Sequence, residues 1–312
     1  MKSLDQAVED YLVLRRGLGF KLSDSGPCLH QFVSFLKKRK FGHITTKLAL
    51  KYATKKQDNK PVTWRRELGI IRAFARYRLG ADARTEIPPT ELLRCRSQRA
   101  KPYLYSQDEI RRLLQAALDM KSRFGRDLKQ QTHYCLFALL SVTGMRIGEA
   151  INLQPEDVNL TDGILTIRQT KFRKSRCIPL HPSTCIALRN YAKVRDTVLA
   201  DRAITRFFMS NRGRKLDRAH VTEVFHELSR QIGIRKPDEH HGPRLHDFRH
   251  RFAILTLLNW YKRGEDADRL LPVLSTYLGH GQVSCTYWYL GSTPELLAAA
   301  SSRIEDRWKG VL

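Results

Sequence analysis

The chain has 312 residues, enough for about two domains that each bury a core. Its most apolar run, residues 135–142, is too short to span a membrane, and its six cysteines form neither a C-x-x-C pair nor a zinc-binding spacing. With 56 Lys and Arg against 31 Asp and Glu, the net charge is +25. The pattern predicts reduced thiols and no metal site, and the absence of a signal-peptide core at the N-terminus predicts a cytoplasmic, nucleoid-associated protein of bacterial type.

The positive charge is spread along the chain. Residues 1–100 hold 22 basic and 9 acidic side chains, and the remainder holds 34 and 22. Many dispersed phosphate contacts are favoured by counterion release, so this distribution favours DNA or RNA as the partner. A merely basic, soluble surface is the alternative on charge alone.

The first 80 residues predict a small helical bundle. Helical periodicity covers residues 4–17, 27–40 and 46–55, and a fourth helix starts near Pro61 and should bury Trp64 and Leu68. The outer faces of these helices are basic. Side chains expected to contact DNA are Lys37, Lys38, Arg65, Arg66 and Arg72, although such a face can also be simply solvated.

A boundary near residue 100 separates this bundle from the rest. Residues 86–89 include Pro88 and Pro89, which stop the helical pattern, and residues 94–102 are polar and basic like a linker. A capping box from Ser106 to Glu109 then opens a new helix. We therefore expect domains at 1–98 and 104–312, joined by a linker at 99–103.

The second domain is predicted to be mainly helical with one β-hairpin. Residues 163–168 and 175–180 alternate like strands, and residues 170–174 form a basic hairpin tip between them. Helices resume near Ser183 and Arg218. The predicted fold class is mainly α: an N-terminal helical bundle and an α+β domain with a small β-sheet or hairpin.

Five side chains in this domain suit phosphodiester chemistry. They are Arg146, His246, Arg249, His280 and Tyr289. Each is weak evidence alone, because His-x-x-Arg is a common surface pair and a single tyrosine most often packs in a core. Their order, with a hairpin lysine between the first two, is much less common. Two guanidiniums can grip one phosphate, and a tyrosine can attack it.

These residues lie in stretches that resemble the tyrosine recombinase (phage integrase) family. The stretches are Thr-Gly-Met-Arg-Ile-Gly-Glu-Ala at 143–150, Thr-Lys at 170–171, Pro-Arg-Leu-His-Asp-Phe-Arg-His at 243–250, Tyr-Leu-Gly-His at 277–280 and the late tyrosine at 289. The resemblance covers residues 104–312, and the family's helical core-binding domain fits 1–98. Residues 259–275 look more like recombinases carried by transposons and plasmids.

The resemblance implies a DNA site-specific recombinase that cuts and rejoins strands through a 3′-phosphotyrosyl bond. It implies Tyr289 as nucleophile, Arg146 and Arg249 on the phosphate, Lys171 as general acid and His280 on the phosphate. His246 would assist proton transfer from the tyrosine, and Glu149 would orient the site. No cofactor and no metal are expected. The implied partner is double-stranded DNA carrying paired recombination sites.

Several alternatives stay open. Lys174 competes with Lys171, and Tyr287 and Tyr277 compete with Tyr289, while His240 and His241 suggest a solvated loop rather than a metal site. The segment from residue 292 onward reads as a helix; in this family such a tail docks on a neighbouring protomer, which implies a synaptic homotetramer, but it can also pack on its own domain. A type IB topoisomerase-like relaxase and a non-catalytic DNA-binding protein are the other functions considered.

Overall fold

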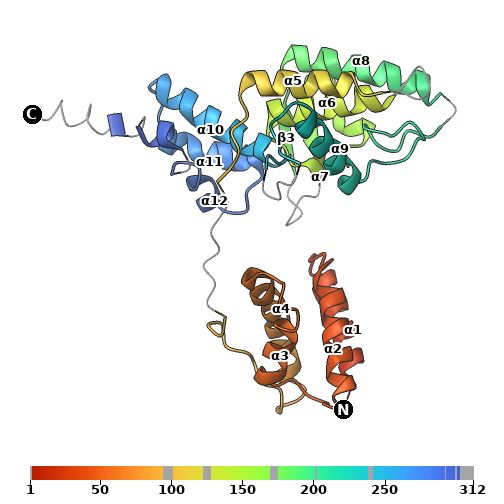
Figure 1. Ribbon diagram of the computed structural model, residues 1–312, viewed down its shortest axis with the longest axis vertical. Coiled ribbons are helices and arrows are strands. Elements are labelled where there is room, and N and C mark those ends of the chain that lie inside the picture. Colours follow the sequence, from red (N-terminus) through yellow and green to blue (C-terminus); the bar gives the residue numbers. More distant parts are fainter. Residues whose placement is uncertain are drawn as a thin grey trace, which may run out of the picture. The chain divides into compact units, whose positions relative to one another are not determined.

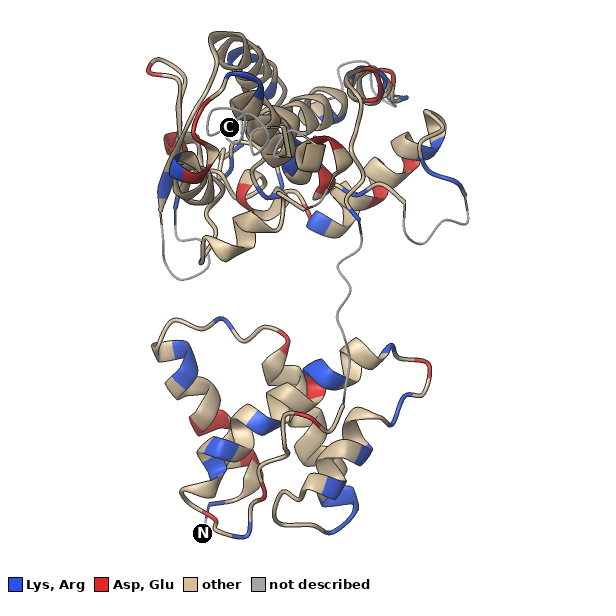
Figure 2. Ribbon diagram, turned by 90° about the vertical axis from the view of Figure 1, so that its left-hand side faces the viewer, with Lys and Arg blue, Asp and Glu red and all other residues tan. Residues whose placement is uncertain are grey.

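The computed structural model divides the chain into two compact units, Met1–Ala100 and Lys101–Leu312 (Figure 1). The residues that the structure describes are 2–93, 101–121, 128–168, 175–200, 202–237, 242–291, 293–298 and 301–302. Both units carry Lys and Arg on several helices, as Figure 2 shows.

The first unit is a bundle of helices, α1 (Leu4–Gly17), α2 (Ser25–Lys38), α3 (Thr46–Ala53) and α4 (Pro61–Leu79). Two of these helices start at side-chain caps, where the hydroxyls of Ser3 and Thr45 accept hydrogen bonds from backbone amides three residues on. The apolar faces meet in one core, in which Phe32 and Phe74 are fully buried. The rings of Phe32 and Tyr52 meet edge to face at 5.2 Å. The basic outer faces are therefore carried on a packed scaffold.

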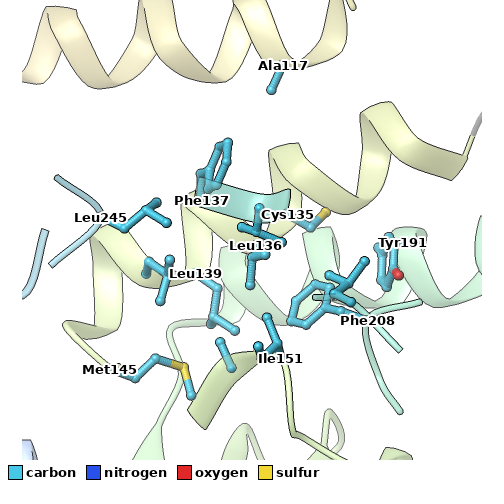
Figure 3. Close-up of a cluster of buried hydrophobic side chains, with 14 of the residues drawn as sticks. Ala117, Cys135, Leu136, Phe137, Leu139, Met145, Ile151, Tyr191, Phe208 and Leu245 are labelled. Carbon is cyan, nitrogen blue, oxygen red and sulfur yellow. The ribbon is translucent and has the colours of Figure 1, made fainter. Parts of the chain in front are cut away.

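Besides helical residues near its C-terminal end, the described part of the second unit has twelve elements. They are α5 (Gln107–Leu118), α6 (Leu128–Thr143), α7 (Ile147–Ala150), η1 (Pro155–Asp157), β1 (Val158–Asn159), β2 (Ile164–Ile167), β3 (Arg176–Pro179), α8 (Pro182–Val198), α9 (Arg218–Gln231), α10 (Asp247–Lys262), α11 (Ala267–Leu278) and α12 (Ser284–Tyr287). Helix α6 packs against α5, α8 and α10, and it is the centre of the main core. Figure 3 shows the side chains of α6 in this core, with Leu136 on the side of Phe208 and Phe137 on the side of Ala117 and Leu245.

The small sheet is antiparallel, in the order β1-β2-β3. Leu165 on β2 pairs with Ile178 on β3, and both side chains are fully buried against the main core. At the loop end of the hairpin, Ile167 pairs with Arg176. This pairing shows where β2 ends and where β3 begins. The predicted hairpin tip, residues 170–174, comes between these two points in the sequence and lies outside the described residues.

The last three helices enclose a second, smaller core. Leu257 of α10 and Leu271, Leu274 and Leu278 of α11 are buried together with Tyr289, which follows α12. Residues 294–298 are helical, and Leu296 is also buried in this cluster. Tyr289 is thus a core residue of this C-terminal group of helices.

The predicted mainly α fold class, with its small sheet, is confirmed. Three details differ from the sequence expectation. Strand β1 has only two residues, too few for an alternating pattern to register. Helix α2 begins and ends two residues earlier than expected. Trp64 is half-buried rather than buried, because its indole N–H donates to the Lys56 carbonyl at 3.0 Å near the surface.

No helix within the described parts of the chain combines the length and the apolar character needed to cross a membrane.

Candidate active site

A glycine turn places Arg146 at the start of α7. Gly144 follows the last residue of α6 with φ of +60°, a backbone conformation that glycine adopts without strain. The chain then reverses, and Arg146 becomes the residue that precedes α7. Its guanidinium donates to Glu149 Oε1 at 2.8 Å and to the Gly279 carbonyl at 3.0 Å. Arg146 therefore ties the end of α6 to the end of α11, two segments more than 100 residues apart.

This turn has no room for a side chain. A Cβ on Gly144 would lie 2.8 Å from the Phe252 ring, in addition to the strain of the positive φ. We expect Gly144→Ala to lower the free energy of unfolding of the second unit by about 2–4 kcal/mol, measured by urea denaturation. The matched control is Gly148→Ala in α7, where no atom lies within 4 Å of the added Cβ. Equal stability of Gly144→Ala and wild type would contradict the packing described.

Glu149 holds two arginines. Its carboxylate accepts from Arg146 and from Arg176, whose Nη2 lies 2.7 Å from Oε2. The side chains of Glu149 and Arg176 are 9% and 8% exposed. Burial alone would raise the pKa of the Glu149 carboxyl, but the hydrogen bonds and charge of Arg176, with those of Arg146, lower that pKa below its ordinary value.

This pair makes stability depend on pH. Because the pKa of Glu149 is lower in the folded state, its contribution is fully present above the unfolded value of about 4.3 and is lost as pH falls through the folded pKa. Glu149→Gln removes one partner of a buried ion pair and should cost about 3 kcal/mol at pH 7. Urea unfolding at pH 7 and at pH 4 should show the difference between wild type and variant shrinking at the lower pH. If the difference in unfolding free energy between wild type and variant is the same at both pH values, Glu149 does not cause the pH dependence.

Arg249 is the most enclosed charge of the group. It lies in the first turn of α10, is 1% exposed, and donates through Nη1 to the Gly144 carbonyl at 3.1 Å and through Nη2 to the Leu278 carbonyl. Burial, and then the positive charge of Arg146, lower its pKa to about 10, so it remains charged at neutral pH. A guanidinium has five N–H donors, and these two bonds leave others for a ligand.

Two histidines lie beside these arginines. His280 follows the left-handed residue Gly279 at the end of α11, and its Nδ1 lies 2.8 Å from the Thr286 hydroxyl. Burial and the charge of Arg249 lower its pKa to about 4. His246 precedes α10, and the same two causes lower its pKa as well. His246 is exposed to solvent on one side, and protein atoms cover the rest of its ring. Both imidazoles are neutral at pH 7 and can donate or accept a hydrogen bond.

Tyr289 lies within this group of charges. It is 2% exposed, its ring stacks beside that of His280 at 6.2 Å, and it lies within electrostatic reach of Arg249. Its hydroxyl lies 3.2 Å from Nδ1 of His250. Of the competing tyrosines, Tyr287 is 50% exposed, and the Tyr277 ring stacks on Phe252 at 5.2 Å. Tyr289 is the buried tyrosine whose hydroxyl lies against His250 and whose ring stacks beside His280.

The structure thus brings together Arg146, Glu149, His246, Arg249, His280 and Tyr289. The expected general acid, Lys171, and its competitor Lys174 lie outside the described residues, as do His240 and His241. Among the described residues, no group of three or more His, Cys, Asp or Glu side chains is placed to hold a metal ion.

The expected DNA-contact side chains of the first unit are on exposed helix surfaces, with one exception. Lys38, Arg65 and Arg66 are exposed, and Lys37 is exposed but pairs with Asp5 at 2.6 Å. Arg72 is half-buried and donates to the carbonyls of Pro88 and Pro89 at 2.6 and 2.7 Å. Its guanidinium therefore anchors the segment that follows α4, which limits its reach to a phosphate.

Sequence reasoning missed two side chains of the site. Arg176 on β3 bridges Glu149 and the Tyr277 carbonyl, the latter at 2.7 Å, and nothing in a four-residue strand signals that role. His250 contacts the tyrosine hydroxyl. The spacing of the two histidines could have revealed His250, because His246 and His250 are four residues apart and share a helix face, with ring centroids 4.7 Å apart.

Residues 104–295 match the family model described as the phage integrase family. Over the whole sequence, the chain is 50% identical to the inferred integrase/recombinase y4rB of Sinorhizobium fredii across 311 residues, which cover 99% of each protein. It is 28% identical to the tyrosine recombinase XerC of Thermodesulfovibrio yellowstonii over 229 residues, covering 72% of this chain and 69% of that one.

Solved structures have the same fold. The integrase of transposon Tn1549, in complex with transposon right end DNA, aligns over 98% of this chain and 99% of its own with a TM-score of 0.68 and 14% identity. A lambda integrase dimer bound to a COC′ core site aligns over 94% and 97% with a TM-score of 0.62 and 18% identity.

Proposed function

The chain belongs to the phage integrase family, the tyrosine-type site-specific recombinases, and on this premise we propose that it cuts and rejoins DNA through a bond between Tyr289 and a 3′ phosphate. The observation that carries the proposal is the burial of Tyr289 beside Arg249 and His280, with Arg146 bonded to the turn that precedes His280.

Arg146 and Arg249 are proposed to bind the scissile phosphate. Their guanidiniums are fixed by the carbonyls of Gly279, Gly144 and Leu278, so little rearrangement is needed when the phosphate arrives. The two guanidiniums would stabilise the extra negative charge of the pentavalent transition state. His246 and His280, neutral beside them, are proposed as hydrogen-bonding partners of the same phosphate.

Tyr289 is proposed to attack phosphorus with its hydroxyl oxygen and to release the 5′ oxygen of the next nucleotide. Lys171, between the paired ends of β2 and β3, is proposed to protonate that oxygen. The phosphotyrosyl bond conserves the energy of the phosphodiester, so a 5′ hydroxyl of a second strand can reverse the step. Because the arginines would stabilise the charge of the transition state, the proposed reaction needs no metal ion. We therefore expect activity to survive EDTA.

The partner is proposed to be double-stranded DNA that carries paired recombination sites. The Tn1549 integrase and lambda integrase were solved on DNA, and lambda integrase was also solved as a tetramer bound to a Holliday junction. We propose a homotetramer of this chain on two DNA sites, with the expected DNA-binding domain, residues 1–98, contacting DNA through Lys37, Lys38, Arg65 and Arg66. The C-terminal segment would dock on a neighbour through residues beyond Leu296, which itself packs on its own unit.

A paired-site assay tests this function. A plasmid carrying two copies of the recognition site, obtained from the DNA that flanks the gene, should yield recombinant circles at the sites alone. Relaxation of any supercoiled plasmid without site preference would instead favour a topoisomerase. Binding without strand cleavage would favour a non-catalytic DNA-binding protein.

A further inference from the structure

His250 is the side chain placed against the reacting oxygen. Its Nδ1 lies 3.2 Å from the Tyr289 hydroxyl, and the two rings are 5.5 Å apart at an interplanar angle of 60°. It lies on α10 directly after Arg249, so the residue that would bind the phosphate and the residue that touches the nucleophile are neighbours on one helical turn. A proton leaving the phenol at this position would meet Nδ1 of His250.

The other two histidines are differently engaged. His280 directs its Nδ1 to the Thr286 hydroxyl, at 2.8 Å, and presents its ring face to Tyr289. His246 meets the ring of His250 edge to face, with centroids 4.7 Å apart. Burial, and then the charge of Arg249, lower the pKa of both His246 and His280, so their rings are neutral at neutral pH. Their neutral rings suit hydrogen bonding to a phosphate better than removal of a proton.

The ring of His250 is held in place from several sides. The centroid of the Trp288 ring lies 5.2 Å away and that of His246 lies 4.7 Å away. The backbone amide of His250 donates to the His246 carbonyl at 3.4 Å. A fixed imidazole loses little freedom when the hydroxyl is presented to the phosphate, which is what a positioned proton acceptor requires.

We propose that His250 is the general base that orients the Tyr289 hydroxyl and takes its proton during strand cleavage. This inference rests on the proposed function of Tyr289. In the tautomer with the proton on Nε2, Nδ1 accepts the hydrogen bond of the phenol. As the bond between Tyr289 oxygen and phosphorus forms, the phenol proton passes to Nδ1. The bond from phosphorus to the 5′ oxygen breaks, and that oxygen receives a proton from Lys171.

Rejoining reverses each transfer. The incoming 5′ hydroxyl gives its proton to the lysine, and the imidazolium of His250 returns its proton to the departing Tyr289 oxygen. A phenol has a pKa of about 10 and an imidazole one of about 6.5, so transfer before attack is unfavourable. The proton should therefore move as the new oxygen–phosphorus bond forms, which is the condition under which general base catalysis contributes.

The test is single-turnover cleavage of a nicked suicide substrate by three variants of the full chain. His250→Ala should cleave about 10²–10⁴-fold more slowly than wild type while its DNA dissociation constant stays unchanged. His250→Asn keeps an acceptor oxygen near the position of Nδ1 but cannot take a proton. It should be faster than His250→Ala and remain at least about tenfold below wild type. The matched control His250→Gln extends its amide past that position and should be no faster than His250→Ala.

A second substrate separates the two proton transfers. When sulfur replaces the 5′ bridging oxygen, the leaving group needs no proton, so Lys171→Ala should regain cleavage and His250→Ala should not. Wild-type or faster cleavage by His250→Ala, or full activity of His250→Asn, would overturn the assignment. So would restoration of His250→Ala by the sulfur substrate.

Tyr289→Phe in the same assay shows whether a failure lies in the proposed function or in the role of His250 alone. If Tyr289→Phe still becomes attached to DNA, the proposed function itself fails. If Tyr289→Phe is inert while the His250 variants cleave normally, the role of His250 alone is wrong.

Discussion

Tyr289→Phe is expected to abolish covalent attachment to DNA and recombination, with a loss of at least about 10⁴-fold in the rate of cleavage. The phenyl ring keeps the place of Tyr289 in the C-terminal core, which also contains Leu278 and Leu296. The variant loses the hydroxyl and with it the bond to His250 at 3.2 Å. Folding and DNA binding should therefore be nearly unchanged, and the loss should appear in the chemical step alone.

The matched control for this variant is Tyr287→Phe. Tyr287 lies two residues earlier and is 50% exposed, so removal of its hydroxyl should change neither stability nor cleavage. The measurement is gel separation of the protein–DNA adduct on a nicked substrate, together with a DNA-binding curve. An adduct formed by Tyr289→Phe and lost in Tyr287→Phe would identify the other tyrosine as the nucleophile.

Arg249→Lys is expected to lower both activity and stability, although it keeps the positive charge. A lysine has no planar fork and cannot reach the Gly144 and Leu278 carbonyls together. The cleavage rate should fall about 10²–10³-fold, because one fixed donor to the transition state is lost. Each buried carbonyl left without a donor should cost about 1–3 kcal/mol in the free energy of unfolding.

The matched control for Arg249 is Arg251→Lys on the same helix. Arg251 donates to the Tyr105 carbonyl at 2.6 Å and to the Gln107 side chain at 3.1 Å, near the start of α5. It should lose some stability and keep the cleavage rate at saturating DNA. Urea unfolding and single-turnover cleavage measure the two effects separately. Equal cleavage rates for the Arg249 variant and wild type would remove Arg249 from the phosphate site.

The residues near the chemistry could be named from the sequence because they lie in short local patterns. Arg146 follows a glycine turn, and His246, which precedes α10, is three residues before Arg249 in the first turn of that helix. The Ser106–Glu109 capping box could likewise be read directly, and both of its hydrogen bonds are present. Local signals of this kind depend on neighbours within one or two turns, which the sequence displays.

The contacts that complete the site could not be read in this way. Arg176 and Glu149 are 27 residues apart, and His250 and Tyr289 are 39 apart, so each pairing depends on how β3 and α12 pack against the rest of the unit. Arg72 illustrates the same limit. Its basic helix face suggests a DNA contact, but the path of the chain through Pro88 and Pro89 brings two carbonyls to its guanidinium.

The position of the covalent bond between protein and DNA tests most directly whether Tyr289 is the nucleophile. Wild-type protein trapped on a nicked substrate should be digested with nuclease and trypsin, and the adduct located by tandem mass spectrometry. The tryptic peptide of residues 270–303 contains Tyr277, Tyr287 and Tyr289. We expect the nucleotide on Tyr289, joined through its 3′ phosphate. A nucleotide on Tyr277 or Tyr287, or one joined through a 5′ phosphate, would contradict the site described above.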